Sequence, residues 1–291
     1  MQPDVTIVLT SYNQAMLVEQ AVRMLSESNF TDRMELLIVD DASEVGVLWV
    51  EDVCRRASRT FPSVRLLRFA ENRGVSEARN VGLAEATGRY VNFHDGDDLW
   101  LDGWSESVER MDAEGLTMLV TGLRPLLGTA YPTETPGKTR KEVHPMFHFP
   151  LDDLPHVTPV LVRADVKTRF RVAPTRPTSF WLQPPSGEDV FFVAEVANEG
   201  PYARTEDDYR ILRDGHHDSG RWHGTDHLDV CLAAFKLLRH DLFSWPVVDE
   251  AVGLLSGKGL NPYAVAAVLE QPFPEAEYEE EWRGGGNHEE H

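Results

Sequence analysis

Short runs of hydrophobic residues alternate with segments in which hydrophobic residues recur every three or four positions. The runs at 5–10, 35–39, 64–67 and 90–93 are rich in β-branched and aliphatic residues, which is typical of strands buried on both faces. The segments between them follow helical spacing, as in Leu17, Val18, Ala21, Val22 and Leu25. Strands that alternate with helices in this way predict an α/β fold with a doubly wound, mostly parallel sheet.

The pattern continues less regularly after residue 100. It predicts helices over 101–114, from Glu188 to about 200, and over 226–238, 247–255 and 262–269. It predicts strands over 117–121, 156–162 and 202–212. We therefore expect a main α/β domain over 1–222, a helical region over 223–274, and an acidic, disordered tail over 275–291.

The composition limits the classes of function. The 291 residues include 48 Asp plus Glu against 28 Lys plus Arg, a formal net charge of −20. That balance argues against a surface for nucleic acid or anionic lipid. The two cysteines, Cys54 and Cys231, form no motif, and no run is apolar enough to span a membrane or act as a signal peptide. We expect a cytoplasmic protein without a membrane span.

Polar residues follow three of the predicted strands directly. Thr10, Tyr12 and Asn13 lie at the end of the first strand, Asp40 and Asp41 at the end of the second, and a group of acids at the end of the fourth. Ligands of open parallel sheets bind beyond the carboxyl ends of the strands. The three polar groups therefore predict a binding site at this edge of the sheet.

The fourth strand ends in three carboxylates within four residues, Asp95, Asp97 and Asp98. Carboxylates this close repel one another unless a cation lies among them, and Mg²⁺ and Mn²⁺ prefer such hard oxygen ligands. A solvated turn is the alternative on this stretch alone. The other strand ends favour the binding site.

Five sequence pieces occur in an order that resembles inverting family 2 glycosyltransferases, which have the GT-A fold. The resemblance covers about residues 4–220. The pieces are Val-Leu-Thr-Ser-Tyr-Asn, Val-Asp-Asp-Ala-Ser, Asn-Arg-Gly with Ala-Arg-Asn-Val-Gly, Asp-Gly-Asp-Asp, and Gly-Glu-Asp. Each piece is weak alone, but their order makes the resemblance specific.

The resemblance implies a nucleotide-diphosphate sugar as donor, a UDP-sugar in the first instance, and Mn²⁺ or Mg²⁺ at the diphosphate. Asp97 is the expected main metal ligand, and Asp95 contacts the metal or the sugar and ribose. His217, with His216 as the alternative, is expected to complete the metal shell, because it lies where related enzymes close a loop over the diphosphate. A solvated turn is the other reading of these two histidines.

The same resemblance distributes the other binding roles along the donor. Asp41, with Asp40 as the less certain candidate, accepts a hydrogen bond from the uracil, and Tyr12 stacks on that base. Asn72 and Arg79 face the nucleotide, and Thr10 and Asn13 complete the strand-end group. Arg79 orients carboxylates or phosphates in this interpretation, and a structural ion pair is the alternative.

The catalytic base is expected in the Glu-Asp pair. An inverting transfer needs one base that deprotonates the acceptor hydroxyl as it attacks the anomeric carbon. The resemblance assigns that role to Asp189, with Glu188 as its neighbour or as an acceptor contact. A helix N-terminus lowers the pKa of an Asp, so burial or neighbouring acids must offset that effect.

Several features leave alternatives open. His94 is expected to pack or hydrogen-bond beneath the site, and Trp100, Trp104 and Trp181 form either an acceptor platform or ordinary packing. The helices after residue 226 extend the acceptor groove or form a homo-oligomer interface. The acceptor is a hydroxyl of a cell-envelope glycan, a protein or a natural product. A nucleotidyltransferase and a non-catalytic nucleotide-sugar-binding protein are the rival functions, and the first is disfavoured because no Gly- and Lys-rich loop follows the first strand.

Overall fold

We describe the protein from a computed structural model. The residues that the structure describes are 2–95, 98–100, 103–121, 123–125, 160–170, 188–204, 211–213, 245–257 and 278–284.

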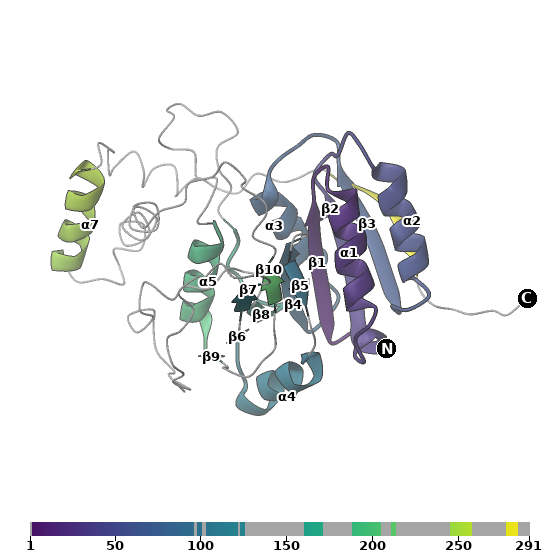
Figure 1. Ribbon diagram of the computed structural model, residues 1–291. Coiled ribbons are helices and arrows are strands. Elements are labelled where there is room, and N and C mark those ends of the chain that lie inside the picture. Colours follow the sequence, from purple (N-terminus) through teal and green to yellow (C-terminus); the bar gives the residue numbers. More distant parts are fainter. Residues whose placement is uncertain are drawn as a thin grey trace, which may run out of the picture.

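A large sheet organises the described part of the chain (Figure 1). Its four central strands are parallel: β1 (Val5–Ser11), β2 (Met34–Asp40), β3 (Ser63–Phe69) and β4 (Tyr90–Asp95). Four further strands complete it: β6 (Met118–Val120), β8 (Val160–Arg163), β9 (Tyr202–Arg204) and β11 (Tyr278–Gly284). The order β11-β3-β2-β1-β4-β8-β6-β9 confirms the predicted mixed, mostly parallel sheet.

Helices cover both faces of the sheet, and the sheet separates the core into two clusters. The cluster on one face includes residues of α3 (Val75–Glu85) and α5 (Glu188–Glu199). The cluster on the other face includes residues of α1 (Ala15–Leu25), α2 (Val47–Ala57) and α4 (Trp104–Glu114). Two layers of helix around one sheet explain why β1 to β4 consist of nearly continuous hydrophobic runs, because neither face meets water.

Helix α3 lies very close to the sheet at a glycine. A Cβ atom built on Gly82 would lie 2.2 Å from Cγ1 of Val8 on β1. No side chain larger than hydrogen fits that space, so Gly82 sets the distance between α3 and β1. Arg79 and Asn80, which precede it on α3, are thereby held near the carboxyl edge of the sheet.

A smaller sheet contains β5 (Asp98–Trp100), β10 (Ile211–Arg213) and β7 (Leu123–Pro125), in that order. The single strand predicted over 202–212 is therefore wrong. Residues 202–204 pair with β6 in the large sheet, and residues 211–213 pair with β5 and β7 in the small one. The two short strands share one stretch of sequence, so hydrophobicity alone did not separate them.

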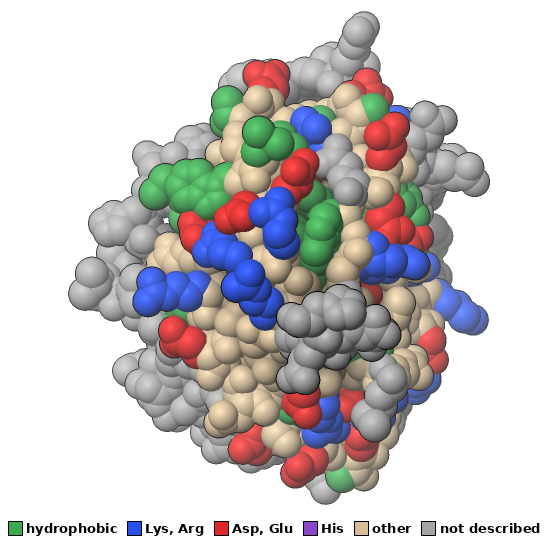
Figure 2. Space-filling view, turned by 90° about the vertical axis from the view of Figure 1, so that its right-hand side faces the viewer, with side chains coloured by type: hydrophobic (Ala, Val, Ile, Leu, Met, Phe, Trp, Pro, Cys, Tyr) green, Lys and Arg blue, Asp and Glu red, His purple; other side chains and the backbone are tan. Residues whose placement is uncertain are grey.

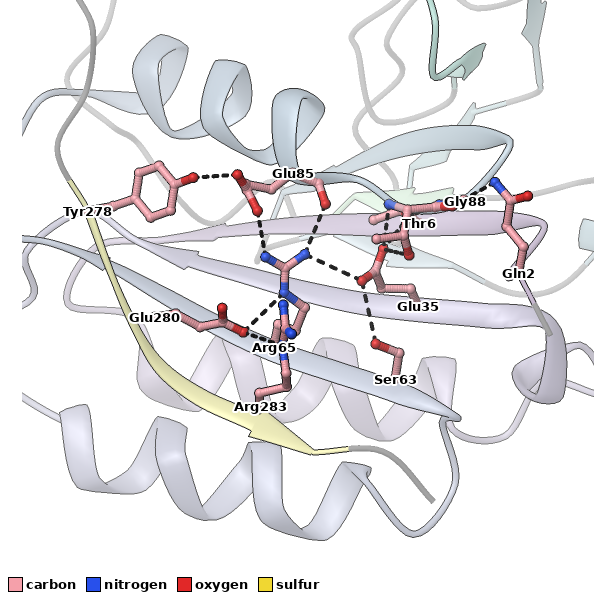
Figure 3. Close-up of polar contacts among 11 residues, drawn as sticks. Gln2, Thr6, Glu35, Ser63, Arg65, Glu85, Gly88, Tyr278, Glu280 and Arg283 are labelled. Carbon is pink, nitrogen blue, oxygen red and sulfur yellow. Dashed lines mark hydrogen bonds and ion pairs between the residues drawn. The ribbon is translucent and has the colours of Figure 1, made fainter. Parts of the chain in front are cut away.

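The acidic C-terminal stretch corrects a second prediction. Residues 278–284 form β11, antiparallel to β3, so the expectation of disorder over 275–291 is wrong for these seven residues. Tyr278 packs against one core cluster and Trp282 against the other. The acids are matched by cations, because Oε1 of Glu280 lies 3.3 Å from Nε of Arg65 and 2.7 Å from Nε of Arg283 (Figure 3).

The remaining boundaries differ in detail. The helix predicted from residue 101 begins at Trp104, and the strand predicted from residue 156 is described from Val160. Helix α7 (Trp245–Gly257) confirms the helix predicted over 247–255. The helices over 226–238 and 262–269 lie outside the described residues, and the division at residue 222 stays a prediction. None of the described helices has the length and apolar character needed to cross a bilayer.

Candidate active site

The carboxyl ends of β1, β2 and β4 lie side by side, as the sequence predicted. In the register of the sheet, Ser11 is opposite Asp40 and Thr10 is opposite Asp95. Thr10 is partly buried there, and the Asp95 side chain is 24% exposed. The strand-end residues therefore form one edge, with acids on both sides of β1.

Asp41 joins the end of β2 to the start of α3. Its carboxylate accepts the backbone N–H groups of Arg73 and Gly74, at 2.6 and 2.8 Å. Nδ2 of Asn72 donates to the Asp41 backbone carbonyl at 3.2 Å. Burial raises the pKa of Asp41, and the two backbone N–H groups oppose that shift. Asp41 thus fixes the loop in which Asn72 lies, a role that the sequence did not suggest.

Asp40 is buried and bound within the protein. It accepts hydrogen bonds from the backbone N–H and the hydroxyl of Ser43, and its Oδ2 lies 3.2 Å from Nε of Arg68. Three polar contacts of this kind fix the loop after β2. Asp40 and Asp41 are therefore both bound within the protein, and which of them contacts a nucleobase stays a prediction.

Asn13 and Tyr12 have different surroundings although they are adjacent. Oδ1 of Asn13 accepts the backbone N–H groups of Glu44 and Val45, at 2.9 and 3.2 Å, so this side chain builds the neighbouring loop. Its φ of 55° lies in the left-handed region that Asn tolerates. Tyr12 is 44% exposed. The Tyr12 ring is accessible for stacking, whereas the Asn13 amide is engaged.

Exposed hydrophobic side chains surround this corner of the molecule (Figure 2). They lie in the loops before α1 and α2 and in the first turns of both helices: Tyr12, Met16, Val45, Leu48 and Trp49. The indole N–H of Trp49 donates to Oε2 of Glu19 at 2.7 Å and joins the two helices. Tyr12 is therefore one of several exposed hydrophobic residues near the starts of α1 and α2.

Arg79 connects the acids of two distant segments. Its NH2 lies 2.7 Å from Oδ1 of Asp95 on β4, and its NH1 lies 3.1 Å from Oε1 of Glu188 on α5. The side chain is 5% exposed. Burial alone would lower the pKa of Arg79, but the carboxylates of Asp95, Glu188 and Asp189 raise it above its usual value. Arg79 is therefore a permanent positive charge among three acids.

Glu188 and Asp189 begin α5, where the sequence predicted a helix start. Burial and repulsion from Asp189 raise the pKa of Glu188, and the charge of Arg79 opposes them. A helix N-terminus also stabilises negative charge. The pair therefore combines one carboxyl held against an arginine with a second carboxyl in the same turn.

Other candidates fall partly or wholly outside the described residues. Asp97, His216, His217 and Trp181 are among these, and Asp98 begins β5. Within the part of the chain that the structure describes, no three His, Cys, Asp or Glu side chains are grouped so as to hold a metal ion.

Two aromatic predictions are resolved. Trp104 is fully buried on α4, so its interpretation as an acceptor platform is wrong, and it packs in the core instead. His94 is 1% exposed and lies opposite Leu9 of β1, which confirms that it lies beneath the edge.

Sequence reasoning missed three features near these acids. Arg68 binds Asp40, Glu77 is buried in the first turn of α3, and Asn80 binds the backbone of Phe170. The Ala-Arg-Asn motif contains Asn80, but the motif gives no sign of its partner 90 residues away. Only the fold reveals these contacts.

The sequence is similar to a known protein family and to several known proteins. The model of a family described as "Glycosyl transferase family 2" matches residues 6–144. The succinoglycan biosynthesis protein ExoO of Rhizobium meliloti is 34% identical over 123 residues, 42% of this chain and 33% of that protein. The putative teichuronic acid biosynthesis glycosyltransferase TuaG of Bacillus subtilis is 32% identical over 122 residues, 42% of this chain and 47% of that protein. The chain thus spans less than half the length of these relatives.

Solved structures share the fold over a longer stretch. The S. aureus TarS 1–349 structure in complex with UDP-GlcNAc has a TM-score of 0.65 and 18% identity. The match covers 87% of this chain and 73% of that one. The mannosyltransferase PcManGT of Pyrobaculum calidifontis, in complex with GDP-Man and Mn²⁺, has a TM-score of 0.53 and also 18% identity, over 92% and 73% of the two chains. At this level of identity the likeness confirms the predicted GT-A fold.

Proposed function

We propose that the chain is an inverting, metal-dependent glycosyltransferase with a UDP-sugar donor, because its residues 6–144 match the model of glycosyl transferase family 2. The acceptor is a hydroxyl group, and a cell-envelope polysaccharide is the acceptor class that the named relatives favour.

The observation that carries this proposal is the position of Arg79. One guanidinium binds the acid at the end of β4 and an acid at the start of α5, 2.7 and 3.1 Å away. We expect donor binding at the carboxyl edge of the sheet and general-base catalysis at the start of α5. Arg79 therefore links the donor site to the catalytic base. A purely structural ion pair would not need to join these two segments at the ligand edge of the sheet.

The proposed metal ligands are of the types that a divalent cation prefers. Asp95 presents a partly exposed carboxylate at the strand edge, and Asp97 follows two residues later in the sequence. We propose that both hold Mn²⁺ or Mg²⁺, with His217 as a further ligand, because such ions bind carboxylate oxygens and also accept imidazole. A bound cation would neutralise charge on the diphosphate as it leaves.

We assign the binding of the donor's nucleobase to the part of the sheet edge that is formed by the ends of β1 and β2. Tyr12 has an accessible ring for stacking, and Asp41, whose backbone carbonyl Asn72 contacts, follows the neighbouring strand β2. The TarS structure contains UDP-GlcNAc, which supports uracil as the base in a chain with the same fold. Asp41 is the proposed acceptor for the uracil N–H.

We assign the chemical step to Asp189. The acceptor oxygen attacks the anomeric carbon, the bond from that carbon to the diphosphate breaks, and the acceptor proton moves to the Asp189 carboxylate. The Glu188 carboxylate binds Arg79, so its proposed role is to hold the guanidinium beside Asp95.

Calorimetry with a panel of nucleotides tests the proposal. We expect UDP to bind more tightly in Mn²⁺ than in EDTA, and Asp97→Ala to remove the difference while the protein stays folded. Equal UDP affinity in Mn²⁺ and EDTA would contradict the metal assignment. A response to UTP but not to UDP or UDP-sugars would favour a nucleotidyltransferase instead.

A further inference from the structure

One aromatic ring lies against the central arginine of the site. The Cζ atom of Arg79 is 5.4 Å from the centroid of the Phe170 ring. Phe170 is fully buried, and the Arg79 side chain is 5% exposed. A guanidinium within about 6 Å of a ring face is attracted to it, and the attraction grows when water is excluded. Among the described residues, Arg79 therefore contacts two acids and one ring.

The backbone of Phe170 is fixed by the residue that follows Arg79. The N–H of Phe170 donates to Oδ1 of Asn80 at 2.7 Å, and its carbonyl accepts from Nδ2 of Asn80 at 2.9 Å. Both hydrogen-bonding groups of one backbone residue are thus held by one amide. Of two adjacent residues of α3, Arg79 is the cation and Asn80 holds the ring beside it.

Two other rings extend this contact to the segments that hold the acids. Phe170 stacks on Phe192 with centroids 4.0 Å apart and an interplanar angle of 5°. Phe93 packs edge-on against both, with centroids 4.8 and 5.4 Å away. Phe93 precedes Asp95 by two residues on β4, and Phe192 follows Glu188 by four residues on α5. Each acid that binds Arg79 therefore lies within one turn or two strand positions of a ring in the same cluster.

We propose that Phe170, held by Asn80, is a positioning residue that orients Arg79 between Asp95 and Glu188. Two carboxylates fix two nitrogen atoms of the guanidinium but leave its plane free to tilt about the line that joins them. A buried ring face beside the guanidinium restricts that tilt. The inference rests on the proposed function in one respect, since it assumes that the orientation of Asp95 matters for donor binding.

A thermodynamic cycle tests the physical contact without any ligand. The cycle uses Phe170→Leu, Arg79→Lys and the double variant of the full chain, with the free energy of unfolding measured in urea. We expect non-additive losses, such that Phe170→Leu costs less once Arg79 has been replaced. Phe61→Leu is the matched control, because Phe61 is also a buried phenylalanine but belongs to the core cluster on the other face of the sheet. If the losses of unfolding free energy in Phe170→Leu and Arg79→Lys simply add in the double variant, the proposal is wrong.

If the Arg79 variant does not fold, the ring itself can be varied. Phe170→Tyr keeps a ring face, whereas Phe170→Leu removes it at a similar length. We expect UDP affinity in Mn²⁺ to fall about tenfold in Phe170→Leu and to be mostly restored in Phe170→Tyr. Phe61→Leu should leave UDP affinity unchanged even where its loss of stability is similar.

The outcomes separate the two proposals. If the wild type binds no nucleotide of the panel, the proposed function is wrong, and the unfolding cycle still decides whether Phe170 and Arg79 are coupled. If the cycle shows coupling but Phe170→Leu binds UDP like the wild type, the contact is only structural and the positioning role is wrong. A decrease in UDP affinity of the same size in Phe61→Leu would also contradict it.

Discussion

Individual carboxyl groups near the edge of the sheet are in very different states. Glu188 is held by Arg79, Asp41 by two backbone N–H groups and Asp40 by Ser43 and Arg68. Glu77 is an exception among the described residues, because both of its carboxylate oxygens are buried without a hydrogen-bond partner. Burial raises the pKa of Glu77, and the charge of Asp41 adds to the shift against the influence of Arg73. A change in the protonation of Glu77 is therefore expected to change stability.

We expect Glu77→Gln to stabilise the folded protein above neutral pH, by about 1 kcal/mol, because the variant does not bury a charge. The pKa of Glu77 is raised on folding, so its contribution to stability is complete below the pKa of the unfolded chain and is lost as the pH rises through the folded value. The free energy of unfolding of the wild type should equal that of the variant near pH 4 and become smaller than it towards pH 8. Urea unfolding at several pH values measures the difference. A difference independent of pH would contradict a buried, titrating Glu77.

The proposed base gives a prediction at the same scale. Asp189→Asn should keep UDP affinity in Mn²⁺ and reduce transfer by about 100- to 10,000-fold, the range expected for loss of a general base. UDP release with a glycan acceptor measures the turnover, and calorimetry measures the binding. Turnover close to that of the wild type would assign the base to another residue.

At the scale of elements, α3 is the centre of the site. Asp41 binds the backbone before its first turn, Gly82 sets its distance from β1, and Arg79 and Asn80 project from it to β4, α5 and Phe170. Any shift of α3 would therefore change several contacts together.

Gly82→Ala tests the close contact of α3 with the sheet. The new Cβ would lie 2.2 Å from Val8 Cγ1, so the helix must move, and we expect a loss of about 1–3 kcal/mol. Gly253→Ala on α7 is the matched control, since no atom lies within 4 Å of its Cβ position. That variant should be stabilised by about 0.5–1 kcal/mol through helix propensity alone. Chemical unfolding of both variants checks the pair, and equal effects would show that the space at Gly82 does not matter.

The sequence predicted the elements whose pattern is local. The hydrophobic runs of β1 to β4 are visible because both faces of these strands are buried. The acids at the ends of β2 and β4 are visible because ligand edges are polar. The partners of those acids were not visible. Arg79 meets Glu188 across 109 residues and Asn80 meets Phe170 across 90, and no periodicity links such positions. Strand β11 was missed because its three consecutive glutamates resemble a solvated segment.

At the scale of the whole molecule, the C-terminal strand ties the chain together. Glu35, Arg65, Glu85 and Glu280 form a network between β2, β3, α3 and β11, and the hydroxyl of Tyr278 donates to Oε1 of Glu85 (Figure 3). Arg65 is 5% exposed, so its charge is matched inside the protein by carboxylates from other elements. Strand β11 therefore holds the C-terminal end of the helix that carries Arg79.

This network has a pH dependence of its own. The hydrogen bond from Tyr278 lowers the pKa of Glu85, and Arg65 acts in the same direction against burial. The stabilisation by Glu85 is therefore complete above its unfolded pKa of about 4.5 and is lost as the pH falls through the lower folded value. Tyr278→Phe should cost about 1 kcal/mol at pH 7, because partial exposure screens the carboxylate, and less near pH 3. Glu279→Gln, at an exposed position of the same strand, is the control. Equal costs at both pH values would contradict the role of the Glu85 carboxylate.

Removal of the whole strand has a larger expected effect than any single contact. A chain that ends at residue 277 lacks the backbone partner of β3 and the packing of Tyr278 and Trp282 against both core clusters. The exposed edge of β3 would then be open to pairing with another molecule. We expect a lower Tm and self-association that increases with protein concentration, measured by thermal unfolding and light scattering. Because β11 also holds α3 through Glu85, UDP affinity in Mn²⁺ should fall in the truncated chain even at temperatures where it is folded. A truncated chain with wild-type stability and UDP affinity would show that β11 only covers the edge of the sheet.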